Sequence, residues 1–277
     1  MRLIFLLLIA LGYILFNLMD LKTSNEELLA NLKTDAIRTE VSTYISDGIE
    51  MRYVDIGNEA NPLVIFIHGA PGSLDAFNKF LKDPDLRRKT RMIAVDRAGY
   101  GQSNFGIPET SLQKQAKLIA PLLEKNKNNQ KPILVGHSFG GTIAAKLAMD
   151  YPEKIGGLIL AGAAIDPEHE KFFSIARIID IHFLYKVVPD SMKVANAEKN
   201  THVEELKKML PYWPKITTMV TILHGKKDGL VPIENAYFAE KVLQNAEVKM
   251  AIYEDSGHLI PWTSPELLKK EILSLIK

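Results

Sequence analysis

The amino-acid sequence predicts an α/β fold in which a mostly parallel sheet is flanked by helices. Two observations support this prediction. Segments with the pattern of a strand alternate along the chain with segments that have the 3.6-residue period of a helix. Several of the strands are continuous apolar runs, such as Leu-Val-Ile-Phe-Ile at 63–67, as expected where a sheet is covered on both faces. A chain of 277 residues with 47% hydrophobic content can build one such core.

The predicted sheet has eight strands, of which the first two form a hairpin. Residues 41–46 and 49–56 flank Asp47-Gly48, a dipeptide that favours a tight turn. The later strands are predicted at 63–67, 92–95, 133–135, 158–161, 219–223 and 248–253. Helices are predicted between and after them, at 74–86, 111–125, 140–150, 233–244 and 265–276.

One interval is too long for a simple connection between strands. Residues 166–215 show helical periodicity, and a loop of this length without secondary structure is uncommon in a compact domain. We therefore expect a small helical lid here. Its aromatic and aliphatic side chains could line an acyl or apolar pocket, but for each of them taken singly we favour packing of the lid on the sheet.

The N-terminal residues differ in character from the domain at 41–277. Residues 3–19 are an uncharged, apolar run that is just long enough to cross a bilayer. We expect residues 1–20 to be an uncleaved membrane anchor. Residues 21–40 are then a linker with a short helix that begins at the capping-box sequence Ser24-Asn25-Glu26-Glu27.

A cleaved signal peptide is the alternative for the same segment. Its best small-x-small site, Ala10-Leu11-Gly12, would leave an exposed apolar tail after cleavage. Arg2 precedes the segment, whereas Asp20 and Lys22 cancel after it, which favours an N-terminus in the cytoplasm. We thus expect a membrane-anchored protein with an extracytoplasmic domain, or a secreted or periplasmic one if the segment is removed.

Composition excludes several classes of partner. The chain has 34 basic and 33 acidic residues, so no net field would attract nucleic acid. It has no cysteine, which excludes disulfides and thiolate metal sites. Its seven histidines show no H-E-x-x-H or similar pairing, so we expect no metal. The sequence does not indicate an oligomeric state.

Ser138 is the strongest candidate for chemistry. It stands in Gly136-His137-Ser138-Phe139-Gly140, between a predicted strand and a predicted helix. Such a turn lifts a serine hydroxyl out of the end of a sheet, and its glycines prevent collisions with the neighbouring strand and helix.

An acid and a histidine follow later strands in the same way. Asp228 comes after the strand at 219–223, and His258 comes after the strand at 248–253. Loops after parallel strands share one edge of a sheet, so we expect Ser138, Asp228 and His258 to converge there. His258 would accept the serine proton, and Asp228 would hold the ring. Asp255 and Asp96 are weaker candidates, because Asp255 is too close to His258 in the chain and Asp96 stands in a turn.

Four blocks of sequence, in this order, resemble the alpha/beta-hydrolase superfamily from about residue 42 to the C-terminus. They are His-Gly-Ala-Pro-Gly at 68–72, Asp-Arg-Ala-Gly-Tyr-Gly-Gln-Ser at 96–103, the Ser138 turn, and the Asp228 and His258 loops. The first block is similar to the turn of the proline iminopeptidase and epoxide hydrolase branches, with alanine where the peptidases usually have glycine. Epoxide hydrolases and haloalkane dehalogenases carry aspartate at the position of Ser138, which argues against both of those chemistries.

The resemblance implies the alpha/beta-hydrolase fold and an oxyanion hole next to the serine. The backbone N–H groups of Ala70 and Phe139 are the candidate donors. Among the other histidines, we expect His137 to support the serine turn and His202, in the lid, to be solvated.

We therefore expect a serine hydrolase that cleaves a small-molecule carboxylic ester through an acyl-enzyme, without a cofactor. One alternative is an aminopeptidase or amidase of the proline iminopeptidase type, for which Glu168, Glu170 or Glu198 in the lid would hold the substrate ammonium. Acyl transfer is a further alternative. It differs from hydrolysis only in the molecule that takes the place of water at the second step, and the sequence does not separate the two. A non-catalytic, ligand-binding protein of the hydrolase fold is the last alternative.

Overall fold

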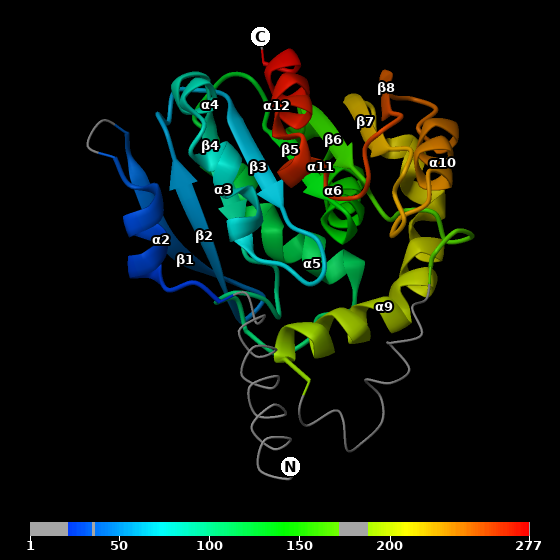
Figure 1. Cartoon of the computed structure of the whole chain (residues 1–277), viewed down its shortest axis with the longest axis horizontal. Coiled ribbons are helices and arrows are strands. Elements are labelled where there is room, and N and C mark those ends of the chain that lie inside the picture. Colours follow the sequence, from blue (N-terminus) through cyan, green and yellow to red (C-terminus); the bar gives the residue numbers. More distant parts are fainter. Residues whose placement is uncertain (1–21, 35–36, 172–187, 277) are drawn as a thin grey trace, which may run out of the picture.

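The computed structural model describes residues 22–34, 37–171 and 188–276, which form one eight-stranded sheet flanked by helices (Figure 1). The strand order is β1-β2-β4-β3-β5-β6-β7-β8. The strands are β1 (Thr39–Ser46), β2 (Ile49–Ile56), β3 (Leu63–Ile67), β4 (Arg91–Val95), β5 (Ile133–His137), β6 (Gly157–Ala161), β7 (Met219–Gly225) and β8 (Val248–Tyr253). The pairs β1–β2 and β2–β4 are antiparallel, and the remaining pairs are parallel. The predicted fold class is thus confirmed.

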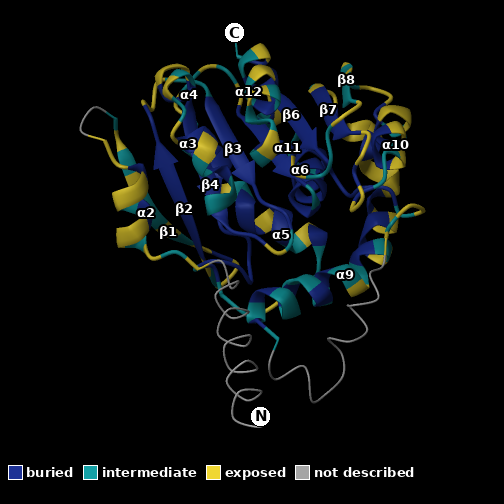
Figure 2. Ribbon diagram, in the orientation of Figure 1, coloured by how far each residue is buried: buried dark blue, intermediate teal, exposed yellow. Residues whose placement is uncertain are grey.

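Helices cover both faces of the sheet. Helices α5 (Leu112–Ile119), α6 (Phe139–Asp150) and α10 (Glu234–Val242) contribute to one apolar core, and α2 (Asn25–Leu32), α3 (Asn78–Leu81), α4 (Pro84–Lys89) and α12 (Pro265–Ser274) contribute to the other. Successive side chains of a strand point to opposite faces, so Ile65 of β3 belongs to the first core and Phe66 to the second. The central strands are accordingly buried along their length (Figure 2).

Two predicted helices are shorter than expected because of proline. The helix expected at 74–86 consists of a 3-10 turn, η2 (Leu74–Phe77), followed by α3 and α4. Pro84 begins α4, and the Asp83 side chain caps it by accepting from the Leu86 N–H at 3.0 Å. The helix expected at 111–125 changes from α5 to the 3-10 helix η3 (Ala120–Lys125), where Pro121 has no N–H to donate.

The long interval between β6 and β7 contains α9 (Asp190–Met209) and the 3-10 helix η5 (Leu210–Lys215). Helix α9 lies across the end of the sheet at which β3 and β5 terminate (Figure 1). Residues 172–187 of the predicted lid lie outside the described residues. The shorter elements η4 (Pro152–Lys154) and α11 (Ile260–Thr263) complete the fold.

Helix α2 begins as its capping box predicts, because Ser24 Oγ accepts from the Glu27 N–H at 3.1 Å. Its Leu28 and Leu32 side chains are fully buried in the same core as α3 and α12. The segment expected to be a linker therefore packs on the sheet through this helix.

The prediction of a transmembrane helix and signal anchor is corrected. Within the described ranges, every helix is too short or too polar to cross a bilayer. The segment to which the anchor was assigned, residues 1–20, lies outside the described residues.

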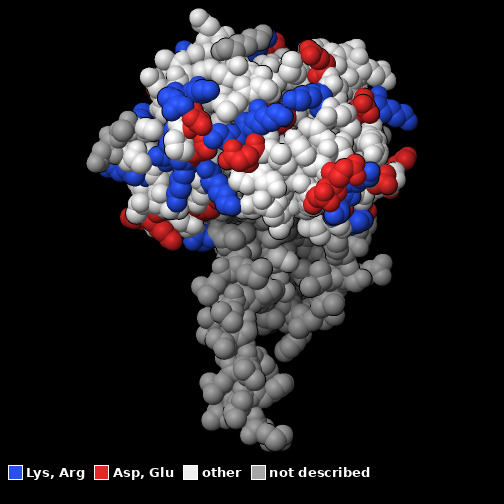
Figure 3. Space-filling view, turned by 45° about the horizontal axis from the view of Figure 1, so that its top comes forward, with Lys and Arg blue, Asp and Glu red and all other residues white. Residues whose placement is uncertain are grey.

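Charges of both signs lie close together on the face shown in Figure 3. Oppositely charged side chains also form ion pairs in the described part of the chain, such as those of Lys269 with Asp83 at 2.7 Å and with Asp85 at 3.1 Å. This face therefore does not carry a field of a single sign.

Candidate active site

Ser138 sits in a strained turn between β5 and α6. Its φ is +54° and its ψ is −125°, a backbone conformation that non-glycine residues rarely adopt. The Ser138 N–H donates to Ala161 O at 3.0 Å, and Ser138 O accepts from the Gly141 N–H at 2.9 Å. The turn is thus held by the neighbouring strand and by the first turn of α6, and it presents the side chain beyond the end of the sheet.

The glycines around Ser138 are required by space. A Cβ on Gly136 would lie 2.5 Å from Gly140 O, and one on Gly140 would lie 2.2 Å from Ile67 O. A Cβ on Gly141 would lie 2.4 Å from the Cβ of Ala163. Each distance is well inside van der Waals contact, so the turn cannot hold larger residues without moving β3, α6 or the segment after β6.

Asp228 and His258 form a direct hydrogen bond. His258 Nδ1 donates to Asp228 Oδ2 at 2.7 Å, which leaves Nε2 as the proton acceptor of the neutral ring. Asp228 Oδ1 accepts from the N–H groups of Leu230 and Val231 at 2.9 and 2.8 Å. Burial acts to raise the pKa of Asp228, but His258 and these two N–H groups hold it below its usual value. The carboxylate therefore remains charged beside the ring.

The loops that carry Asp228 and His258 contact each other through their backbones. A Cβ on Gly225, at the end of β7, would lie 2.4 Å from Ser256 O. The Lys227 N–H donates to the same oxygen at 2.9 Å. The relative position of the acid and the histidine is therefore fixed by main-chain atoms.

Neither of the other candidate acids contacts His258. Asp96 is fully buried and accepts from Arg52 Nε at 2.7 Å and from the Leu74 N–H at 2.9 Å. Asp255 has a side chain that is 91% exposed and pairs with Lys227. The structure thus brings Asp228 to the histidine, as the sequence predicts, and assigns the other two to structural and surface contacts.

Ser138 and His258 line the same cavity, which has a volume of about 200 Å³. The rest of its wall is largely apolar and includes Pro71, Phe139, Met192, Leu230 and Val231. Within the described residues the Ser138 hydroxyl has no hydrogen-bond partner. In ligand-free sites such bonds often form only when substrate is bound.

The two predicted oxyanion donors flank the serine. Phe139 is the first residue of α6, and Ala70 lines the cavity in the loop after β3. A Cβ on Gly69 would lie 3.0 Å from Ser138 Cβ, so this loop lies directly against the serine turn. Neither amide takes part in a backbone hydrogen bond with another described residue. Both N–H groups are therefore available to an oxygen in the cavity.

His202 corrects an expectation from the sequence. It was expected to be solvated, but it is only 1% exposed and lines the cavity. Its ring packs 4.5 Å from the Phe139 ring, and its Nδ1 donates to Glu170 Oε1 at 2.8 Å. Burial acts to raise the pKa of Glu170, but His202 and Lys199 hold it below its usual value. The cavity thus has a polar region, on α9 and the segment before it, in which the sequence suggested Glu170 but not His202.

Three other histidines support the loops, as expected for buried imidazoles near glycines. His137 Nε2 donates to His258 O at 3.1 Å, and His224 Nε2 donates to Val231 O at 3.0 Å. His68 Nδ1 donates to Gly69 O at 2.8 Å. Burial, with His258 nearby, lowers the pKa of His137 to about 3, and burial also lowers the pKa of His68 and His224.

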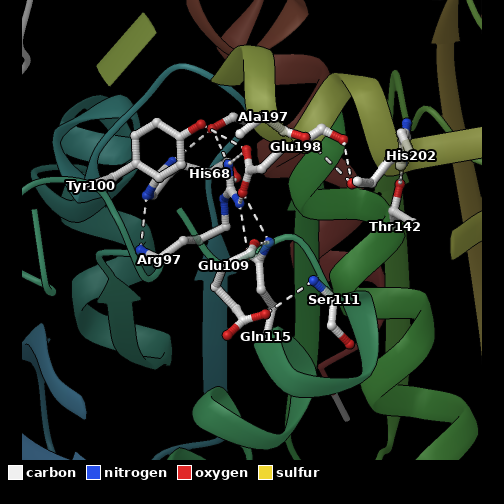
Figure 4. Close-up of polar contacts among 12 residues, drawn as sticks. His68, Arg97, Tyr100, Glu109, Ser111, Gln115, Thr142, Ala197, Glu198 and His202 are labelled. Carbon is white, nitrogen blue, oxygen red and sulfur yellow. Dashed lines mark hydrogen bonds and ion pairs between the residues drawn. The ribbon is translucent and has the colours of Figure 1, made fainter. Parts of the chain in front are cut away.

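A buried network joins α9 to the loop after β3 (Figure 4). Arg97 Nη1 contacts Glu198 Oε1 at 2.6 Å, and the Tyr100 hydroxyl donates to Glu198 Oε2 at 2.6 Å. Gln115 Nε2 donates to Glu198 Oε1 at 2.9 Å. Glu198 was considered as a binder of substrate ammonium, but it is fully buried and its two oxygens are occupied by these donors.

The described residues contain no cluster of three or more histidine, aspartate or glutamate side chains that could hold a metal ion.

Comparisons with known proteins agree with this architecture. Residues 62–181 match the family model of the alpha/beta hydrolase fold. The chain is 26% identical over 272 residues to proline iminopeptidase PfmaB of Pestalotiopsis fici, covering 82% of this chain and 96% of that protein. It is 25% identical over 281 residues to the uncharacterized hydrolase YugF of Bacillus subtilis, covering 86% and 98%.

A solved structure has the same fold. The crystal structure of a bacterial membrane phospholipase A matches with a TM-score of 0.65 and 22% sequence identity, covering 99% of this chain and 96% of that one. At this identity the likeness concerns the fold.

Proposed function

We propose that this chain, which belongs to the alpha/beta-hydrolase superfamily, is a serine hydrolase that cleaves a carboxylic ester through an acyl-enzyme. The single observation that carries the proposal is the 2.7 Å bond to the charged Asp228 from His258, which lines the same cavity as Ser138. A serine hydroxyl becomes nucleophilic when an imidazole held by a carboxylate in this way accepts its proton.

In the proposed reaction, His258 Nε2 accepts the proton of Ser138 as Oγ attacks the ester carbonyl. Asp228 stabilises the imidazolium that forms, and the N–H groups of Ala70 and Phe139 stabilise the negative oxygen of the tetrahedral intermediate. His258 then gives its proton to the leaving alcohol. Water attacks the acyl-enzyme with His258 as base, which releases the acid and restores the serine.

Ser138→Ala tests this proposal. We expect kcat on an acyl nitrophenyl ester to fall by about 10⁴-fold or more, because the nucleophile is lost while the fold is kept. A fluorophosphonate probe should label the native protein and fail to label the variant. The matched control is Ser274→Ala, an exposed serine on α12 that bonds Glu271 O at 2.8 Å and should change neither result.

Turnover by Ser138→Ala close to that of the native protein would remove this serine as the nucleophile. A native protein that binds esters without turnover and without labelling would instead indicate a non-catalytic ligand-binding protein.

Cleavage of an N-terminal residue from a peptide is the second candidate function, supported by the similarity to proline iminopeptidase PfmaB. The contacts of the carboxylates considered for ammonium binding favour ester hydrolysis over peptide cleavage. Glu198 is occupied by Arg97, Glu170 pairs with His202 and Lys199, and Glu168 is exposed. Hydrolysis of aminoacyl anilides but not of acyl nitrophenyl esters would favour the peptidase.

A further inference from the structure

Arg97 is a fully buried cation with no role in the reaction proposed above. It lies two residues beyond the end of β4, at the same end of the sheet as Ser138. Buried guanidinium groups are costly unless their donors are satisfied, so its partners indicate what it does.

Arg97 holds the peptide that carries one of the oxyanion donors. Its Nη2 donates to Gly69 O at 3.1 Å, and its Nε donates to His68 O at 2.9 Å. Gly69 O and the N–H of Ala70 belong to the same peptide group. Since a peptide group is planar, fixing the direction of the oxygen also fixes the direction of the N–H.

His68 reinforces the same peptide. Its Nε2 accepts from the Arg97 N–H at 3.0 Å while its Nδ1 donates to Gly69 O at 2.8 Å. The arginine and the histidine thus both act on Gly69 O. Donors on a carbonyl oxygen polarise the peptide and strengthen its N–H as a donor, so these contacts affect both the aim and the strength of the Ala70 amide.

Helix α9 holds Arg97 in turn, through the paired contacts of Glu198. The two nitrogens Nη1 and Nη2 lie 2.6 and 3.2 Å from Oε1 and Oε2. The guanidinium also lies 4.9 Å from the ring centroid of Phe139, whose N–H is the second oxyanion donor. One side chain therefore contacts α9, the loop of the first donor and the residue of the second. The contacts of Arg97 with Glu198 are drawn in Figure 4.

We propose that Arg97 is a positioning residue for the oxyanion hole, and that Glu198 couples α9 to it. The inference rests on the proposed serine hydrolase function, because it assigns Arg97 a role in stabilising the tetrahedral intermediate of that reaction. It predicts that loss of the paired contacts weakens binding of the transition state and leaves binding of the substrate unchanged.

Arg97→Lys tests the proposal, with Arg91→Lys as the matched control. Lysine keeps the charge but cannot reach both carbonyl oxygens and both carboxylate oxygens. Arg91 lies at the opposite end of β4, is also buried, and contacts Asp55 at 2.6 Å in an equivalent ion pair. The two variants therefore remove the same kind of pair at the two ends of one strand.

For Arg97→Lys we expect kcat to fall by between about 10- and 100-fold with little change in KM, because a misdirected donor costs less than the loss of one. The inhibition constant of a trifluoromethyl ketone, whose adduct with Ser138 carries the oxyanion, should rise by a similar factor. Arg91→Lys should leave kcat and the inhibition constant within about twofold of native values, since it does not contact the site. Thermal unfolding of all variants shows which ones are folded.

Glu198→Gln is the second variant, chosen because it keeps the size of the side chain and one oxygen acceptor. It decides the question if Arg97→Lys does not fold, and the same selective fall in kcat and ketone affinity is expected. A folded variant with native kcat, or one that loses activity only through KM, would overturn the inference. A native protein that forms no ketone or fluorophosphonate adduct would instead defeat the proposed function itself.

Discussion

At the scale of the single residue, the proposal depends on which carboxylate faces His258. Asp228 accepts its Nδ1–H and is buried, whereas Asp255, three positions before His258, points to solvent and pairs with Lys227. Substituting each acid therefore gives a direct comparison. Asp228 is near the histidine in space, whereas Asp255 is near it only in sequence.

We expect Asp228→Asn to lower kcat by about 10⁴-fold, because an amide cannot stabilise the imidazolium and can favour the wrong tautomer of His258. Asp255→Asn should retain native kcat. Steady-state kinetics on an acyl nitrophenyl ester measures both. Equal losses in the two variants, or none in Asp228→Asn, would show that another group orients the ring.

The sequence predicted those site residues that a local pattern identifies, namely a polar residue next to the end of a strand. Ser138, Asp228 and His258 each follow the end of a strand, so punctuation next to an apolar run is enough to find them. Arg97 and Glu198 are 101 residues apart, and the sequence suggested no contact between them: Arg97 stood in a block of the family resemblance, and Glu198 was a candidate for binding substrate ammonium. His202 was misjudged for the same reason, because its burial depends on Glu170 and Phe139, which are distant in the chain.

At the scale of the element, strands were predicted better than helices. All eight were located within two residues at each end, because continuous apolar runs bounded by turn residues define them. The interruptions at Pro84 and Pro121 were not predicted, because helical periodicity continues through both sites while the local backbone does not. The docking of α2 was also missed, since a short polar helix shows no sign of its partner surface.

Leu28→Ala tests the contribution of α2. We expect the free energy of unfolding to fall by about 2–5 kcal/mol, because the side chain is fully buried and its removal leaves a cavity. Leu29→Ala, at the half-buried neighbouring position, should lower the free energy of unfolding by less. Urea denaturation measures both. A loss below about 0.5 kcal/mol for Leu28→Ala, typical of a surface position, would mean that the helix does not pack as described.

At the scale of the whole molecule, buried histidines make stability depend on pH. Burial lowers the pKa of His68, His137 and His224 below that of an unfolded chain, which is about 6.5. Between the two pKa values the unfolded state binds more protons than the folded state, so the free energy of unfolding falls as pH falls. Asp228, whose pKa is also lowered, acts in the same direction at still lower pH. His169 has a raised pKa and opposes the trend, but it is exposed.

We expect the free energy of unfolding to be smaller at about pH 5 than at about pH 7.5, with His137 contributing about 2 kcal/mol of the difference. The value follows from a folded pKa of about 3, which leaves His137 uncharged across this range. Chemical denaturation at the two pH values measures the difference. His137→Gln should reduce it, because glutamine does not titrate. An unchanged difference in that variant would assign the pH dependence to other groups.

The close approach of the backbone at Gly225 to Ser256, with the hydrogen bond from the Lys227 N–H to Ser256 O, has a consequence for how this protein can diversify. Since main-chain atoms join the two loops, the outward side chains of Lys226, Lys227 and Glu254 contribute little to the alignment of the acid and the base. Reversing their charges would alter the long-range attraction of ionic substrates, a rate effect that salt suppresses. Changes in these surface charges would thus alter the rate at which substrate reaches the site without altering the rate of bond cleavage.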